Sequence, residues 1–246
     1  MLLNERITVA GNLFFKYRSF VFPVGLSVLM VLERRHFYYF NRSHTYDLIF
    51  ELICFAVALL GFSIRLIAVG YSRAGTSGRN MKSQRADSLN TDGLYSIVRN
   101  PLYIGNLFGI IGFSMLSQNY EIVVINVLLF SCFYVPIIMR EEQFLLDNFK
   151  EEFLEYAICT PAIIPNFRLW KKPQLKFNYL KLFYREHTTL LGIATAFFAA
   201  EMLREFSMNN IFVLDTMWTS IFTVTLLFWM VLRIFKKKFK TMDRIA

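Results

Sequence analysis

Residues 93–106 read GLYSIVRNPLYIGN and place a cation, a helix-capping residue and a proline directly before an apolar run. Asparagine favours the N-cap, and proline is tolerated at the first helical position because its missing N–H is not needed there. The stretch therefore predicts a helix that begins at Pro101, with the Asn100 side chain as its cap. The guanidinium of Arg99 would lie beside the free N–H groups at this helix start, an arrangement that favours an anion.

The composition predicts that this helix enters a membrane. Of the 246 residues 55% are hydrophobic and 27 are Phe, which is too apolar for a soluble domain of this length. A helix needs roughly 17 to 25 mostly apolar residues to cross a bilayer. The fifth candidate is the weakest, since its acidic and basic end must lie at or beyond the far interface. We expect an all-α integral membrane protein with about six transmembrane helices, near residues 13–32, 46–69, 102–119, 122–139, 188–206 and 211–232.

The distribution of basic residues predicts the orientation. With a cytoplasmic N-terminus, 22 of the 27 Lys and Arg residues fall in inner segments, four fall in outer loops, and Arg65 lies within the second span. This asymmetry is what the positive-inside rule expects, so both termini are predicted to be cytoplasmic, in a bacterial inner membrane or an ER-type membrane. The net charge of +9 then indicates attraction to anionic headgroups, and no nucleic acid is expected as a partner because the cations form no single face.

The third and fourth predicted spans form a hairpin, because only a short polar turn near residues 118–121 separates them. Its two inner ends must therefore lie close together. Glu142 falls on the apolar stripe of an amphipathic helix that continues from the fourth span, whereas Glu141 lies about 100° around that helix. A carboxylate on a buried stripe needs a partner, and Arg99 across the hairpin mouth can supply it. The alternative is that Arg99 extends to lipid headgroups and Glu142 faces water.

Two further cations are candidates for substrate binding. Arg79 ends the loop sequence GTSGRN, in which glycines and hydroxyl residues can present N–H groups to a phosphate. Arg65, at the inner end of the second span, can reach the same pocket. The alternatives are an ordinary flexible loop for Arg79 and a headgroup contact for Arg65. No metal site is expected, because the three histidines lack ligand spacing, and no disulfide is expected from three scattered cysteines.

The stretch GLYSIVRNPLYIGN is followed after about forty residues by EEQFLLDNFKEEFLEYAICTPAIIPNF. Together they resemble the isoprenylcysteine carboxyl methyltransferase and phospholipid methyltransferase family, over roughly residues 60–167. The family pattern is G-x-Y-x-x-V-R-H-P-x-Y-x-G, then E-E-x-x-L after a membrane hairpin. The resemblance implies a non-Rossmann pocket for S-adenosylmethionine on the cytoplasmic side, at the ends of the hairpin. It implies catalytic roles for Arg99 and Glu142, and cofactor binding by Asn100, Pro101, Tyr103, Glu141 and Glu142.

One departure from the family pattern bears on the acceptor. Asn100 stands where the family usually has histidine, and asparagine cannot carry a proton in the physiological range. A membrane lipid or a prenylated acceptor is implied by the resemblance. The missing histidine and the surplus of basic residues favour O-methylation of an anionic oxygen, a carboxylate or a lipid phosphate, since an amine must first lose a proton. The alternatives are N-methylation of an aminophospholipid, an NADPH-dependent membrane sterol-type reductase, and a scaffold without enzymatic activity.

The chain is expected to have three parts. Residues 1–69 carry the N-terminal transmembrane helices. Residues 70–167 form the methyltransferase core of loop, hairpin and amphipathic helix. Residues 168–246 form a basic linker and a C-terminal transmembrane pair, for which only an anchoring or lipid-access role is expected.

Overall fold

The computed structural model describes residue 14, residues 44–73, residue 76, residues 86–212 and residues 214–238. Within these ranges the chain is all-α, as expected, with one isolated β-bridge and no strand. Except for Phe14, the first predicted span lies outside the described residues. The helices are α3 (His44–Tyr71), α4 (Leu94–Ile97), α5 (Pro101–Met115), α6 (Tyr120–Cys159), the short 3₁₀ helix η3 (Phe167–Leu169), α7 (Tyr179–Asn209) and α8 (Thr216–Lys238).

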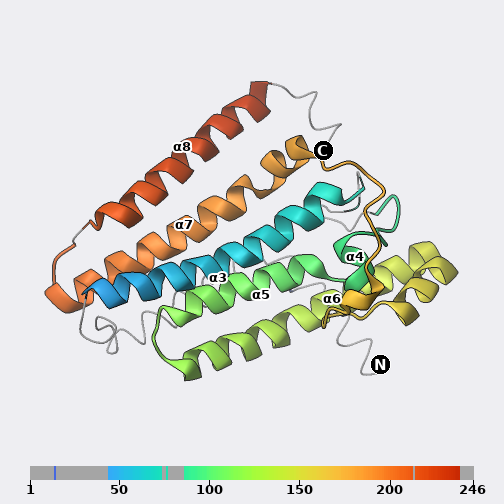
Figure 1. Ribbon diagram of the computed structural model, residues 1–246, viewed down its shortest axis with the longest axis horizontal. Helices are drawn as coiled ribbons and strands as arrows, with labels where there is room; N and C mark the ends of the chain where they lie inside the picture. Colours follow the sequence, from blue (N-terminus) through green and yellow to red (C-terminus); the bar gives the residue numbers. More distant parts are fainter. Residues whose placement is uncertain (1–13, 15–43, 74–75, 77–85, 213, 239–246) are drawn as a thin grey trace.

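Five of these helices form a single layered bundle. Figure 1 shows them side by side in the order α8, α7, α3, α5, α6, and each helix contacts its neighbours in that order. Among the described residues, α3, α6 and α8 are long and apolar enough to cross a membrane, whereas α5 is a shorter apolar helix. This supports an integral membrane protein. The predicted spans in α5 and α7 do not meet the same criteria of length and composition.

Close contact between α3 and α5 positions the end of the bundle where α5 begins, which we call the inner end, the opposite end being the outer end. A Cβ atom built on Gly105 would lie 2.6 Å from the carbonyl oxygen of Gly61 and 2.5 Å from Cγ of Arg65. Glycine is therefore required in this part of the PLYIG sequence, because the two backbones approach more closely than any side chain permits. The same approach leaves room for the stem of Arg65 against α5.

The helix α6 differs from the prediction of one continuous amphipathic helix. The backbone leaves helical geometry at Lys150, where φ is 45° and ψ is −116°. A straight helix would separate Glu142 from Ala157 by about 22 Å. Both residues nevertheless bind the same guanidinium, that of Arg99, so the chain must reverse between them. The last turns of α6 therefore fold back toward the hairpin mouth, at the yellow end of Figure 1.

The segment after α6 is hydrogen-bonded along the stretch that precedes α5. The Arg99 N–H donates to the Pro161 carbonyl over 2.9 Å, and the Asn166 N–H donates to the Ile97 carbonyl over 2.9 Å. Further along, the Lys171 N–H donates to Oγ of Ser96 over 2.9 Å. We call residues 157–172 the tail segment. It lies at the level where α5 begins.

Two polar contacts attach α7 to the core. At its inner end, the buried Lys181 donates from Nζ to the Ser72 carbonyl over 2.7 Å and to Oγ of the same serine over 2.6 Å. At its outer end, Arg204 pairs with three carboxylates from α3 and α7, those of Asp47, Glu51 and Glu201. The charged end of α7 was expected at or beyond the far interface. It is buried between helices, because α3 supplies partners for it.

Candidate functional site

Arg99 and Glu142 meet at the inner mouth of the α5–α6 hairpin. Nε of Arg99 lies 2.9 Å from Oε1 of Glu142, and Nη2 lies 3.0 Å from Oε2, so the pair is bidentate. The Arg99 side chain is 16% exposed to solvent and the Glu142 side chain is 23% exposed, which places the pair at the edge of the protein rather than in its interior. The expectation that these side chains lie together is therefore met, although the geometry alone assigns them no chemical role.

Arg99 also closes the end of α6. Its Nη1 atom donates to the carbonyl oxygens of Ala157, over 2.7 Å, and Thr160, over 2.6 Å. Carbonyls in the last turn of a helix have no partner within the helix, and a cation there is favourable. Four of the five N–H groups of Arg99 are thus engaged by described residues. The fifth N–H, on Nη2, has no partner among the residues that the structure describes.

Asn100 does not cap α5 through its side chain, contrary to the prediction. Its Nδ2 atom donates instead to Oε1 of Glu142, over 3.2 Å, and to the Ala162 carbonyl, over 3.1 Å. The Glu142 carboxylate and the tail segment each accept a hydrogen bond from this NH₂ group and so orient the amide, and the sequence around Pro101 gives no sign of either. The proline itself stands at the first position of α5, as predicted.

Two of the expected cofactor ligands lie elsewhere. The ring of Tyr103 packs against Tyr134, with centroids 5.1 Å apart, in the apolar layer between α5 and α6. Glu141 interacts electrostatically with Tyr95 on α4. Burial, and then the Glu141 carboxylate, raises the pKa of Tyr95, so this phenol stays neutral at physiological pH. Neither Tyr103 nor Glu141 lines the cavity beside Arg99.

Arg65 forms a second ion pair, on the other side of α5. Its Nε and Nη2 atoms lie 2.9 and 2.8 Å from the two carboxylate oxygens of Glu186 on α7. Its Nη1 atom donates to Oδ1 of Asn106 over 2.7 Å. Sequence reasoning missed Glu186, because nothing in the pattern of α7 indicates which face meets α3. The other expected substrate-binding residue, Arg79, lies outside the described residues.

An open cavity of about 730 Å³ lies between Arg99 and the tail segment. Of the site residues expected from the sequence, only Arg99 lines it. The remaining wall comes from the end of α6 and the residues after it. The proline-rich sequence TPAIIPNF was the one feature of the sequence that could have indicated this wall. The lining residues are Arg99, Ala157, Ile158, Cys159, Thr160, Pro161, Ile164, Pro165, Asn166, Phe167 and Arg168.

The walls of this cavity favour charges of both signs. The carbonyl groups at the end of α6 form the negative end of a helix dipole, which favours a cation. Arg99 and the exposed Arg168 favour an anion. Ile158, Ile164 and Phe167 add an apolar rim. A zwitterion with an apolar portion therefore fits the cavity chemically.

Comparison with known proteins finds a family match for the central part of the chain. Residues 52–152 match the family model described as phospholipid methyltransferase. The cobalt-zinc-cadmium resistance protein CzcN of Cupriavidus metallidurans is 33% identical over 115 residues, 47% of this chain and 50% of that protein. The nickel-cobalt-cadmium resistance protein NccN of Alcaligenes xylosoxydans xylosoxydans is 29% identical over 161 residues, 64% of this chain and 73% of that protein.

A third relative is a named methyltransferase. The protein-S-isoprenylcysteine O-methyltransferase of Schizosaccharomyces pombe is 33% identical over 88 residues, 34% of this chain and 36% of that protein. The chain thus spans about half the length of the first relative and about a third of this one. No solved structure matches the chain. The family match includes Arg65, Arg99 and Glu142, and it ends before the tail segment and Glu186.

Proposed function

This chain belongs, through residues 52–152, to the phospholipid methyltransferase family, and from that premise we propose that it is a methyltransferase that uses S-adenosylmethionine to methylate a membrane lipid or a lipidated acceptor. The observation that carries the proposal is the cavity at the hairpin mouth. Arg99 lies on its wall, held by Glu142, and Ala157, whose carbonyl accepts a hydrogen bond from Arg99, lines the same space at the end of α6.

S-adenosylmethionine fits the charges of this cavity. Its α-carboxylate matches the remaining N–H of Arg99, and its sulfonium and ammonium groups match the carbonyl end of α6. When bound, it supplies an electrophilic methyl group: the S–CH₃ bond breaks with its electron pair left on sulfur, an acceptor lone pair forms the new bond, and an anionic oxygen releases no proton.

The residues then have distinct roles in the proposal. Arg99 contacts the cofactor, whereas Glu142 and Asn100 are positioning residues. Glu142 binds the Arg99 guanidinium, and Asn100 donates hydrogen bonds to Glu142 and to the Ala162 carbonyl of the tail segment. Pro101 fixes the start of α5. Tyr103 packs between α5 and α6 and Glu141 lies near Tyr95, so in this proposal neither contacts the cofactor. In-line placement of donor and acceptor supplies much of the rate of such a transfer.

For the acceptor we favour an anionic oxygen of a lipid. Arg168 is the exposed cation on the cavity wall and is the residue to which we assign the contact with that oxygen. Arg65 is less suited to this contact, since it pairs with Glu186 and does not line the cavity. No neutral histidine lies among the lining residues to take a proton from an amine. N-methylation of an aminophospholipid and NADPH-dependent reduction remain the alternatives.

Thiol protection tests the cofactor directly. Cys159 lines the cavity and is exposed, Cys54 is buried, and Cys132 is exposed on α6. In a Cys132→Ser variant, S-adenosylmethionine should slow the alkylation of Cys159, and NADPH should not. Protection by NADPH but not by S-adenosylmethionine would instead select the reductase. Protection by neither would remove the cofactor site from this cavity.

Transfer itself is measured with methyl-labelled S-adenosylmethionine and a total lipid extract. An ester product loses its label in base, and a methylated amine keeps it. Glu142→Gln should lower the rate by about 10²-fold, because a small displacement of Arg99 is enough to misplace the cofactor. Glu155→Gln is the matched control, since Glu155 is an exposed acid on the folded-back part of the same helix. Equal rates in both variants would exclude a role for the ion pair.

Two relatives are named for metal resistance. We propose that this chain affects metal tolerance only through its methylated product. Methylation of an anionic oxygen removes a negative charge from the membrane surface, which weakens the attraction of cations to that surface. Host cells that lack the protein should then grow less well in cobalt or zinc salts. The wild-type chain should restore growth, and the Glu142→Gln variant should not. Equal rescue by both would separate any metal tolerance from methyl transfer.

A further inference from the structure

The tail segment exposes large apolar side chains where α5 begins. Ile158 is 84% exposed, Ile164 is 80% exposed and Phe167 is 76% exposed, so all three present nearly their full surface. They also line one cavity, which places them close to one another. Trp170 follows with 51% of its surface exposed. We call these four residues the tail patch.

The level of the tail patch is fixed by hydrogen bonds. The Pro161 carbonyl accepts from the Arg99 N–H, and the Asn166 N–H donates to the Ile97 carbonyl. These two bonds lie just before Pro101, where the apolar helix α5 starts. Because α5 is apolar from its first turn, we expect its start, and the tail patch bonded beside it, to lie near the level of the lipid headgroups.

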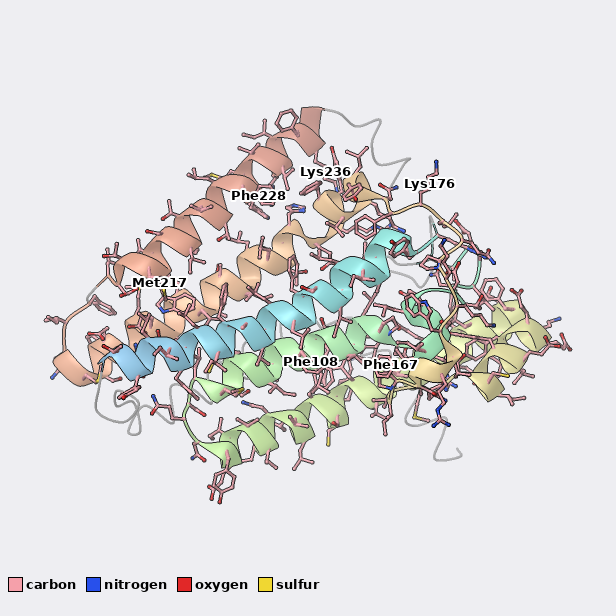
Figure 2. The ribbon with its side chains drawn as sticks, in the orientation of Figure 1. Phe108, Phe167, Lys176, Met217, Phe228 and Lys236 are labelled. Atoms are coloured by element: carbon pink, nitrogen blue, oxygen red, sulfur yellow. The ribbon has the colours of Figure 1, made fainter. Side chains whose placement is uncertain are left out.

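Basic side chains accompany the patch. Arg168, Lys171 and Lys172 are exposed, and residues 156–172 contain no Asp or Glu. Figure 2 shows Phe167 on this segment near the end of α6, and Lys176 extending outward further along the same chain path. Aromatic and aliphatic side chains interleaved with Lys and Arg are the composition of surfaces that lie in an anionic membrane interface.

We propose that the tail patch docks into the headgroup layer of an anionic leaflet and that Arg168, Lys171 and Lys172 gather anionic lipids around it. The cavity beside Arg99 then opens into the headgroup layer rather than into bulk water, because Ile158, Ile164 and Phe167 form both its rim and the docked surface. This docking does not depend on methyl transfer.

Depth-dependent quenching tests the proposal in the full chain. A bimane label is attached at Ile164→Cys in a background of Cys132→Ser and Cys159→Ser, and the protein is placed in nanodiscs. We expect strong quenching by a doxyl group near the lipid headgroup and weak quenching by iodide. The matched control is Glu152→Cys, an exposed position on the folded-back helix that should show the opposite pattern.

The lipid preference has its own measurement. Doxyl-labelled phosphatidylglycerol should quench the label at position 164 more than doxyl-labelled phosphatidylcholine. Replacing Arg168, Lys171 and Lys172 by Gln should reduce that preference, by up to about fivefold for each cation removed.

Two results would overturn the proposal. Iodide quenching at position 164 as strong as at position 152 would show that the patch faces water and is free for a protein partner. Equal quenching by the two lipids would refute the recruitment of anionic lipid. Neither result bears on the protection of Cys159 by S-adenosylmethionine, so the docking surface and the proposed enzyme can fail separately.

Discussion

Replacing Arg99 by Lys should release the tail segment without removing a charge. The guanidinium makes four hydrogen bonds, two with the Glu142 carboxylate and two with the carbonyls of Ala157 and Thr160. A lysine ammonium is a compact donor, so it can keep the contact with Glu142 but cannot also bridge both carbonyls. At least two charge-assisted hydrogen bonds are lost.

The size of the effect follows from these bonds. A hydrogen bond to a charged group contributes about 1.5–3 kcal/mol, and partial exposure of the pair lets water replace some of the loss. We therefore expect a total of about 2–3 kcal/mol. This raises the equilibrium constant for local opening of the segment by about 30- to 150-fold, since each 1.4 kcal/mol is a factor of ten.

Amide hydrogen exchange in nanodiscs measures this opening. Exchange of the Thr160 and Asn166 amides should accelerate by that factor, because both N–H groups are bonded within the region that Arg99 holds. Amides in the middle of α3 should not change. Arg168→Lys is the matched control, since it alters the same cavity without touching these bonds. Unchanged exchange near Thr160, or equal acceleration in α3, would refute the role given to Arg99.

Three further predictions concern other contacts. In thermal unfolding, Gly105→Ala should destabilise the chain by about 1–3 kcal/mol, because the added Cβ overpacks against α3. Gly109→Ala should be neutral or stabilising, because a Cβ added there meets nothing within 4 Å. Tyr156→Phe removes a 2.7 Å hydrogen bond to the Tyr95 carbonyl and should cost about 1 kcal/mol, whereas Tyr120→Phe, at an exposed position, should not change the melting temperature. Burial, and then the charge of a neighbouring arginine, lowers the pKa of Lys181 to about 8 from its ordinary 10.5, so the unfolded chain binds more protons between these two pH values. Lys181 should therefore make the folded chain more stable as the pH rises through this range, and Lys181→Met should abolish that rise in thermal unfolding.

The sequence by itself determined the helical class and the proximity of the two ends of the hairpin. Apolar runs of membrane length separated by a short polar turn leave a hairpin as the simplest arrangement, and a hairpin brings the residues at its two inner ends together. That topology puts Arg99 and Glu142 within reach of each other, and the structure shows that they pair. The position of Pro101 at the start of α5 follows from local backbone chemistry in the same way.

Only the tertiary structure decided what surrounds that pair. The reversal at Lys150 leaves no clear sequence signal, because the apolar period continues through it, yet it brings the end of α6 back to Arg99 and builds the cavity. The Asn100 amide turns to Glu142 and Ala162 rather than capping its own helix, since partners distant in sequence reach it. Sequence periods report which face of a helix is apolar. They do not report which distant segment packs there, and the cavity walls depend on those long-range contacts.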